Sequence, residues 1–202
     1  GNISLSTCEA EWLCEYLTNA DGSINIFSNA SGCSSVVELA NACGGALPCL
    51  PYGNYYLFSQ TDIDNFQLAF ADCAQLQGNV SIKGNDITNL NGLDNVTAIV
   101  GNLVIESNDA LTSLTGLNNL NSITGNLTIG NHYDGNPVLT SLTGLDNLDS
   151  IGGFLNIEEN DALTSLTGLD DLTTIGGYLK IYKNNSLTSL TGLDNLASIG
   201  GH

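Results

Sequence analysis

The sequence predicts a mainly β fold: a right-handed solenoid of stacked parallel strands, with a small helical cap region that disulfides staple together. Two observations lead to this fold class. Five similar segments with a period of 23 or 24 residues follow one another from residue 78 onward, and all six cysteines lie within the first 73 of the 202 residues. A single segment cannot bury its own apolar edge, so the segments must stack on one another.

Each segment opens with an alternating apolar stretch that predicts a strand. In the third segment Leu127 and Ile129 alternate with polar neighbours, which is the period of a strand with one buried face. A later stretch, residues 111–117 in the second segment, has leucines three apart among Gly and Thr, which favours a coil or a short second strand over a helix. The third segment also carries four extra residues around 133–137. The segments begin at Gly78, Gly101, Gly125, Gly153 and Gly177.

Asparagines complete the repeat where the chain must turn a corner. Asn85, Asn108, Asn160 and Asn184 each stand three residues after the strand's isoleucine, where side-chain amides are expected to satisfy bent backbone. The motif G-x-L-x-I-x-x-N followed by L-T-S-L-x-G-L-x-x-L-x-S-I resembles the receptor-L-domain type of leucine-rich repeat, as in secreted surface proteins of Bacteroidetes. The resemblance covers residues 78–202 and implies an L-domain-like leucine-rich-repeat solenoid, a fold that hosts many unrelated binding roles.

The first 50 residues combine strand motifs with helices. Residues 1–5 and 22–29 repeat the opening strand motif, whereas residues 8–17 have helical apolar spacing and residues 34–43 predict a second helix with a serine cap. We expect residues 1–50 to form the end rungs and the disulfide-rich helical cap of a preceding solenoid.

Residues 51–202 are then expected to form the main solenoid. Residues 44–54 predict a linker, residues 55–59 a short strand, and Thr61 to Asp64 a capping box for an N-terminal cap helix at about 60–72. The repeats start at residue 78. Gly201 and His202 stop where a new strand should begin, and Gly1 starts in that phase, so we expect one module of a tandem array or filament. The alternative is a boundary that falls inside a repeat by chance.

The cysteines predict disulfides and an oxidising compartment. There is no C-x-x-C motif, and His132 and His202 lie far away in the sequence, so the spacing matches no zinc site. We expect three disulfides, with Cys49 paired to Cys73 and the first four cysteines paired among themselves, in a secreted or cell-surface protein. The cysteines are Cys8, Cys14, Cys33, Cys43, Cys49 and Cys73.

The charge is strongly negative: 21 Asp and Glu residues face three lysines and no arginine, for a formal net charge of −18. Nucleic acid and anionic membranes need cationic partners, so neither is expected to bind. Membrane insertion is not expected either, because no apolar run approaches the roughly 18 residues needed. The acidity is explained by solubility, with cation binding as the alternative.

Catalysis finds no support in the sequence, and no cofactor is implied apart from calcium. Two histidines cannot build a nucleophilic triad with the cysteines in disulfides. The acidic pairs at 158–159 and 170–171 belong to a repeated pattern, whereas catalytic residues should be singular. We expect a protein that is not an enzyme.

Aspartates recur at one turn of the repeats, and they are the candidate metal ligands. Stacked rungs would place them about 4.8 Å apart, which favours either a calcium ion between them or ordinary turn chemistry. Asn118 replaces the acid in one rung. These residues are Asp94, Asp146, Asp170 and Asp194.

Aromatic residues near the C-terminal end are the candidate binding site. The residue after the first glycine of a segment should point outward, and there two aromatics replace Asn102 and Asn126 of the earlier segments. Together with aromatics of the insertion they suggest a protein interface or a sugar-stacking platform. The alternative is that they cover the insertion or pack against a next unit. The candidates are Phe154, Tyr178, Tyr182, His132 and Tyr133.

These observations favour a non-catalytic extracellular structural or adhesive unit, whose partners are neighbouring copies or modules of the same protein. The alternative function is a ligand-binding module that holds a glycan or a surface protein on the face formed by Phe154 and Tyr178.

Overall fold

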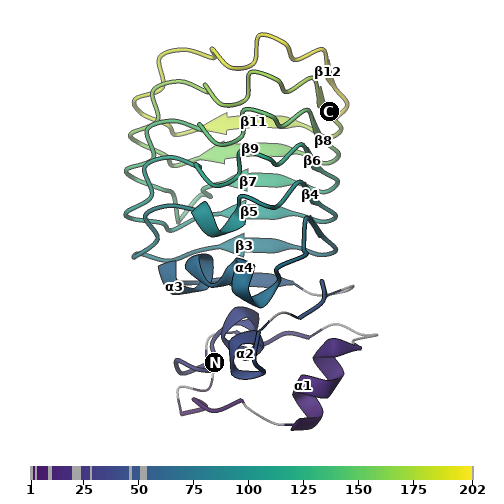
Figure 1. Ribbon diagram of the computed structural model, residues 1–202. Coiled ribbons are helices and arrows are strands. Elements are labelled where there is room, and N and C mark those ends of the chain that lie inside the picture. Colours follow the sequence, from purple (N-terminus) through teal and green to yellow (C-terminus); the bar gives the residue numbers. More distant parts are fainter. Residues whose placement is uncertain are drawn as a thin grey trace.

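The computed structural model describes residues 2, 4–8, 11–19, 24–27, 29–45, 47–50 and 54–201. Its described part is a stack of parallel rungs, with short helices gathered at the N-terminal end (Figure 1). Two parallel sheets of six strands each run along the stack, here called the major and the minor sheet. The predicted mainly β solenoid of parallel strands is confirmed.

The major sheet contains the alternating strands of the repeats. Neighbouring strands pair in parallel, with equivalent residues opposite one another, as for Leu103 and Leu127. Inward residues such as Leu127 and Ile129 are fully buried, whereas Thr128 between them is half-buried. In order the strands are β1 (Tyr55–Leu57), β3 (Val80–Ile82), β5 (Leu103–Ile105), β7 (Leu127–Ile129), β9 (Leu155–Glu158) and β11 (Leu179–Tyr182).

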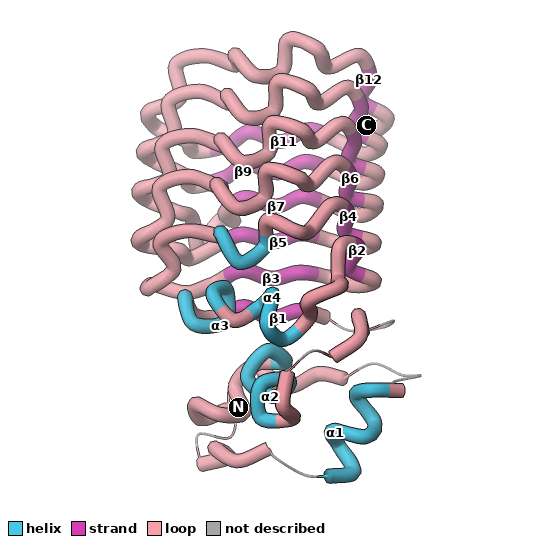
Figure 2. The backbone as a smooth tube through the Cα atoms, in the orientation of Figure 1, coloured by secondary structure: helices cyan, strands magenta, loops and turns pink. Residues whose placement is uncertain are grey.

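The minor sheet lies where each rung closes, and Figure 2 shows its strands as a second wall beside the major sheet. The leucine-rich stretch between the sheets is coil and turn, apart from a short 3-10 helix η1 (Asn91–Leu93), and its leucines turn inward as predicted. The short second strand therefore comes later in the repeat than this stretch. Its copies are β2 (Gln75–Leu76), β4 (Ala98–Ile99), β6 (Ser122–Ile123), β8 (Ser150–Ile151), β10 (Thr174–Ile175) and β12 (Ser198–Ile199).

Glycine allows the coil of adjacent rungs to approach closely. Gly168 has φ 109°, and a Cβ atom at this position would lie 2.2 Å from the carbonyl oxygen of Leu142 in the preceding rung. An L-amino acid with a side chain would meet both a strained backbone and a clash there. The glycine of the recurring T-G-L sequence therefore allows the short distance between the coil segments of adjacent rungs.

Corner asparagines satisfy the backbone between rungs, as predicted. The Asn108 side chain donates through Nδ2 to the carbonyl of Ile82 (3.1 Å), and its backbone N–H donates to Oδ1 of Asn136 (3.3 Å). Asn136 in turn donates to the carbonyl of Ile105 (3.0 Å), and its N–H donates to Asn160 Oδ1 (3.2 Å). The sequence motif did not identify Asn136, because the insertion shifts it away from its usual spacing.

Among the described residues, four helices stand before the repeats: α1 (Glu11–Thr18), α2 (Val36–Ala42), α3 (Gln60–Asp64) and α4 (Phe66–Ala69). The single cap helix predicted at about 60–72 is thus two short helices that end earlier. Its capping residue was also wrong: the Ser59 side chain, rather than Thr61, accepts the Asp62 N–H (3.1 Å). Asn65 caps α3 and separates it from α4.

The helix α2 covers the N-terminal end of this solenoid. Its residues Val36, Val37 and Leu39 are buried in the same core cluster as Tyr55 of β1 and Phe66 of α4. Described residues of the region before residue 51 thus share a core with the solenoid that follows. The expected division at residue 50, and a preceding solenoid closed by residues 1–50, stay predictions.

Part of the linker predicted at residues 44–54 is packed against the chain around it. Leu47 and Leu50 are buried, the Leu47 N–H donates to the Ala69 carbonyl (2.8 Å), and the Leu50 N–H donates to the Tyr55 hydroxyl (3.1 Å). Among the early strand motifs, described residues 24–27 form no strand. Gly1 and Gly22, which open those motifs, lie outside the described residues.

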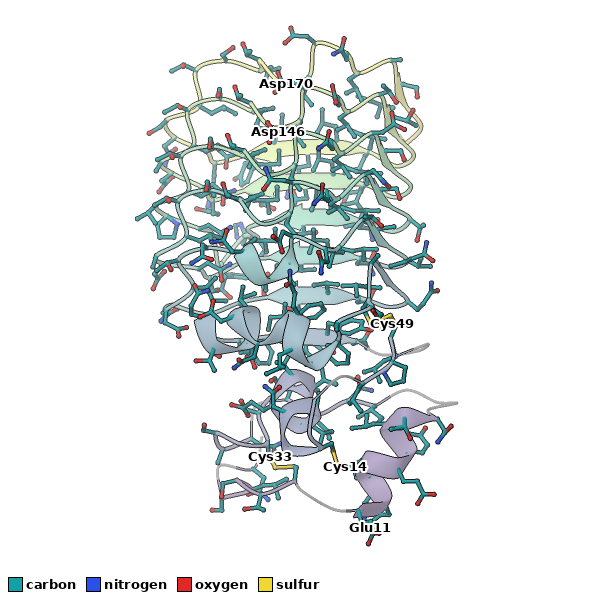
Figure 3. All side chains as sticks on the ribbon, viewed as in Figure 1. Glu11, Cys14, Cys33, Cys49, Asp146 and Asp170 are labelled. Carbon is teal, nitrogen blue, oxygen red and sulfur yellow. A yellow bond between two sulfur atoms is a disulfide. The ribbon has the colours of Figure 1, made fainter. Side chains whose placement is uncertain are left out.

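Three disulfides hold the N-terminal region, as predicted. They join Cys8 to Cys33, Cys14 to Cys43, and Cys49 to Cys73 (Figure 3). The third one ties the packed segment 47–50 to the chain just after α4.

Candidate functional site

A ladder of asparagines leads up the major sheet to two aromatic residues. The side-chain oxygen of Asn79 accepts the Asn102 N–H (2.9 Å), and that of Asn102 accepts the Asn126 N–H (2.8 Å). Asn126 accepts the Phe154 N–H (2.9 Å) in the same way. Phe154 has no side-chain acceptor, so the ladder of amides ends there. The next contact is instead a stack of the Phe154 and Tyr178 rings, with centroids 4.7 Å apart and an interplanar angle of 10°.

The stacked rings lie at the surface. Tyr178 is 41% exposed and Phe154 is half-buried. Two residues further along the strands, Asn156 of β9 lies opposite Lys180 of β11 in the parallel register. We call these four outward-facing residues, of which Asn156 is largely buried, the β9–β11 patch (Phe154, Asn156, Tyr178 and Lys180).

A buried carboxylate supports the patch from the same face. Glu158 is only 3% exposed, accepts a hydrogen bond from Asn156 Nδ2 (3.0 Å) and receives Lys180 Nζ at 2.9 Å from both carboxylate oxygens. Burial raises the pKa of Glu158. The hydrogen bonds from Asn156 and Lys180 and the nearby positions of Lys180 and His132 outweigh burial, so that the pKa lies below its ordinary value. Glu158 is therefore an ionised anchor for both neighbours.

Asn156 has an unused hydrogen-bond acceptor. The residue is 9% exposed, and its Oδ1 atom is buried without a hydrogen-bond partner in the part of the chain that the structure describes. The contact of Nδ2 with a carboxylate requires the donor end of the amide to face Glu158, which fixes the direction of Oδ1. A buried acceptor left unpaired lowers the stability of the fold by about 1–3 kcal/mol. The Oδ1 atom of Asn156 can therefore accept a hydrogen bond from a ligand.

The insertion of the third repeat is held against the preceding rungs. Asn131 donates to Glu106, and Lys83 Nζ pairs with Asp134 (3.1 Å) and with Glu106 (3.4 Å). Within this loop the exposed rings of His132 and Tyr133 contact edge to face, with centroids 4.7 Å apart, and Tyr133 is 87% exposed.

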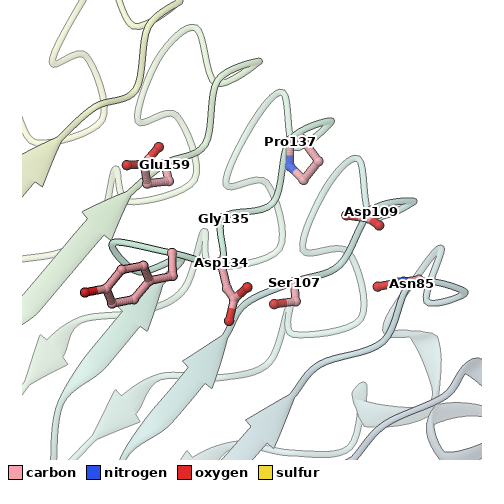
Figure 4. Close-up of a pocket in the computed structure, with 8 residues that line it drawn as sticks. Asn85, Ser107, Asp109, Asp134, Gly135, Pro137 and Glu159 are labelled. Atoms are coloured by element: carbon pink, nitrogen blue, oxygen red, sulfur yellow. The ribbon is translucent and has the colours of Figure 1, made fainter.

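A pocket of about 310 Å³ opens between the insertion and the corner of the rungs (Figure 4). Gly135 brings the loop close to its neighbour, since a Cβ atom there would lie 1.6 Å from the Glu159 carbonyl oxygen. Ser107 and Glu159 adopt left-handed backbone, with φ 53° and 58°. The insertion therefore packs closely against the next rung at this wall of the pocket. The carboxylates of Asp109, Asp134 and Glu159 line the pocket. The lining residues are Asn85, Ser107, Asp109, Tyr133, Asp134, Gly135, Pro137 and Glu159.

All three lysines of the chain lie beside the major sheet, next to carboxylates. Lys83 and Lys180 make the contacts described above, and Lys183 Nζ lies 2.6 Å from Glu159. The ring of Tyr182, which is 45% exposed, has Lys180 Nζ at 5.3 Å and Lys183 Nζ at 5.5 Å from its centroid. This face is therefore closer to neutral than the rest of a chain with net charge −18.

In a comparison with known proteins, the match covers the repeat region. The family model described as Receptor L domain matches residues 72–140 and 147–202, which is more than half of the chain. The chain belongs to the receptor L domain family. This is a family of non-enzymatic, ligand-binding domains, and together with the three disulfides it indicates an extracellular location for this receptor L domain. The Bacteroidetes type stays a prediction.

No curated protein and no solved structure matches this receptor L domain. Among the described residues, no helix has the length and apolar character needed to cross a membrane.

The structure of this receptor L domain places the predicted aromatics on one side but in two groups. Phe154 and Tyr178 stack directly before β9 and β11, while Tyr182 lies at the end of β11, opposite Glu158. His132 is near enough to Glu158 to influence its pKa, whereas Tyr133 lines the pocket. Sequence reasoning missed Asn156. Its signal was a polar residue at an outward strand position two residues after an aromatic.

The recurring aspartates of this receptor L domain close turns. The carboxylates of Asp146, Asp170 and Asp194 each accept the N–H of the glycine two residues earlier, at 2.7, 2.9 and 3.3 Å, and Asn118 does the same (3.0 Å). Figure 3 labels two of them. Asp94 instead contacts Gln67. The described residues contain no group of three or more His, Cys, Asp or Glu side chains suited to a metal ion. The geometry favours the turn interpretation, and calcium binding stays an untested prediction.

Proposed function

We propose that this receptor L domain is a ligand-binding module of an extracellular surface protein, and that the ligand lies on the outer face of the major sheet over the β9–β11 patch. The observation that carries the proposal is the stack of Phe154 and Tyr178, which stands exposed where the earlier rungs have asparagines. Aromatic rings that stay at the surface of a regular scaffold are typical of recognition sites.

The scaffold supports the proposal because it holds the patch rigidly. The inward residues of β9, Leu155 and Ile157, are fully buried, and each outward residue is fixed by the register of the parallel strands. A ligand therefore meets a surface that is already ordered, which lowers the entropy cost of binding. The lysines beside the major sheet also offset part of the negative charge there. A ligand with negative groups is therefore repelled less at this face than at other faces of a chain with net charge −18.

The test is the double variant Phe154→Ala/Tyr178→Ala in the full chain, with Trp12→Ala as control because Trp12 is 70% exposed and lies in α1. We expect the double variant to lose binding to immobilised extracellular-matrix extracts and glycans by at least tenfold, with an unchanged melting temperature. The control should bind as the parent does. Equal binding by the double variant and the parent would contradict the proposal.

A second candidate function is a structural or adhesive unit in a tandem array. The parallel register of both six-stranded sheets supports it, because a stack of equivalent rungs can be continued by further rungs of the same kind.

Electron microscopy of two copies of the chain joined in series tests this second function. Continuous rods with a regular axial repeat would support the array. Separate particles joined at variable angles would contradict it and would leave the binding face as the function.

A further inference from the structure

We propose that the β9–β11 patch binds a neutral glycan, with a sugar ring against the Tyr178–Phe154 stack and a sugar hydroxyl donating to Asn156 Oδ1. This inference rests on the proposed function and names the ligand class for the same site.

The shape of the patch suits a flat ring. The two aromatic rings are nearly parallel, so each covers one face of the other, and what remains for a ligand is ring edge and the free face of the half-exposed Tyr178. Neighbouring strands are about 4.8 Å apart, and successive outward residues are about 7 Å apart along a strand. The four outward positions therefore span an area comparable to one or two sugar rings, whose C–H groups pack favourably on the negative face of an aromatic ring.

The surroundings favour a glycan over a protein surface. Interfaces between proteins have an apolar centre, in which anchor side chains fill pockets. The residues beside Asn156 on the outer face are polar instead: Thr128 lies in register on one side, and Lys180 lies on the other. A ligand that offers hydroxyl groups at the edge of an apolar ring matches this mixture.

Asn156 supplies the hydrogen-bond acceptor. Its Nδ2 is occupied by Glu158 (3.0 Å), and its Oδ1 is the buried acceptor without a partner in the described residues. A hydroxyl group is the donor that completes it. Because the atom is covered in the free protein, the hydroxyl reaches it after a small shift of the side chains around Asn156, while Lys180 keeps its contact with Glu158.

The charges favour a neutral ligand. Lys180 already contacts both oxygens of Glu158 at 2.9 Å, so the patch holds a balanced ion pair and no free cation for an acidic sugar. The net charge of −18 repels sulfated or uronic-acid chains in addition.

Binding of the full chain to a panel of immobilised neutral hexose and N-acetylhexosamine oligosaccharides, beside their sulfated and uronic-acid counterparts, tests the inference. Asn156→Ala removes the acceptor, and Thr128→Ala is the matched control on the neighbouring strand. We expect binding to a neutral oligosaccharide that is weakened at least tenfold by Asn156→Ala and lost with Tyr178→Ala, but kept by Thr128→Ala.

The other outcomes separate this inference from the proposed function. Binding only to acidic glycans would overturn the neutral-glycan assignment, and neutral-glycan binding that Asn156→Ala leaves unchanged would overturn the contact with Asn156. In both cases the patch remains a binding site if Tyr178→Ala abolishes binding. If the chain binds a protein but no glycan, and Tyr178→Ala abolishes that binding, the glycan assignment is overturned and the patch remains a binding site. Binding that ignores Phe154 and Tyr178 altogether would overturn the proposed function itself. A melting temperature for each variant shows that the fold is intact.

Discussion

The repeat solenoid and the region before it reach stability by different means. In the solenoid each rung buries leucines and isoleucines against the rungs on either side, and corner asparagines satisfy the backbone between them. The described residues before β1 contain no strand, and two of the three disulfides lie wholly within them. A rung is stabilised by stacking on similar neighbours and needs no disulfide. The described region before β1 lacks such neighbours and is stabilised by disulfides instead.

The largest effect is expected from a cavity inside the solenoid. Leu166→Ala should lower the free energy of unfolding by about 2–5 kcal/mol, because Leu166 is fully buried between rungs. Leu190→Ala changes the equivalent residue of the outermost described rung, which is 59% exposed, and should cost less than about 1 kcal/mol. Denaturant unfolding of both variants measures the difference. Equal losses would show that the outermost rung is covered in solution.

The next effect concerns the cap. Replacing Cys14 and Cys43 together by serine should lower the stability of the region before residue 50 by about 2–4 kcal/mol, because it releases a loop that the disulfide closes. The major sheet has no cysteine and should keep its protection. Hydrogen exchange followed by mass spectrometry resolves the two regions. Loss of protection in β5 to β9 together with α2 would mean that the cap and the solenoid unfold as one unit.

The smallest effect is a pH dependence at the junction of the two regions. Asp62 in α3 is 2% exposed and contacts the Ser35 hydroxyl at the start of α2. Burial raises the pKa of Asp62, and it outweighs the hydrogen bonds from Ser35, Phe58 and Ser59 that lower it.

Because the folded pKa lies above the unfolded value, folding favours the protonated form of Asp62. Its contribution to stability should therefore rise as pH falls from neutral through the folded pKa, and level off below the unfolded pKa. The difference in melting temperature between the parent and Asp62→Asn, measured from pH 7 to pH 3, separates the contribution of Asp62 from those of the other carboxylates. A difference that does not change with pH would contradict it.

Within the repeats, the sequence was a reliable guide because one rule is applied many times. The alternation at Leu127 and Ile129 and the corner position of Asn108 both hold in the structure. Before the repeats begin at residue 78, no recurring pattern supports the interpretation of a single segment. The helix expected at 60–72 breaks at Asn65, and the expected linker carries the buried Leu47.

The candidate site shows the same limit. The outward positions of Phe154 and Tyr178 followed from period-two alternation, but their stacking at 10° depends on how two rungs superpose. The unpaired oxygen of Asn156 depends on Glu158 occupying the other end of its amide, and neither residue belongs to the repeat motif.

The sequence by itself determined the solenoid, its inward leucines, its corner asparagines and the presence of disulfides, because periodicity and composition act locally and recur in every rung. Only the tertiary structure decided that α2 lies against β1, that the insertion forms a pocket with the corner, and that a buried carboxylate and an unpaired amide oxygen stand beside two stacked rings. These arrangements join residues far apart in the chain or in different rungs, and their energies come from packing and desolvation that no local pattern records.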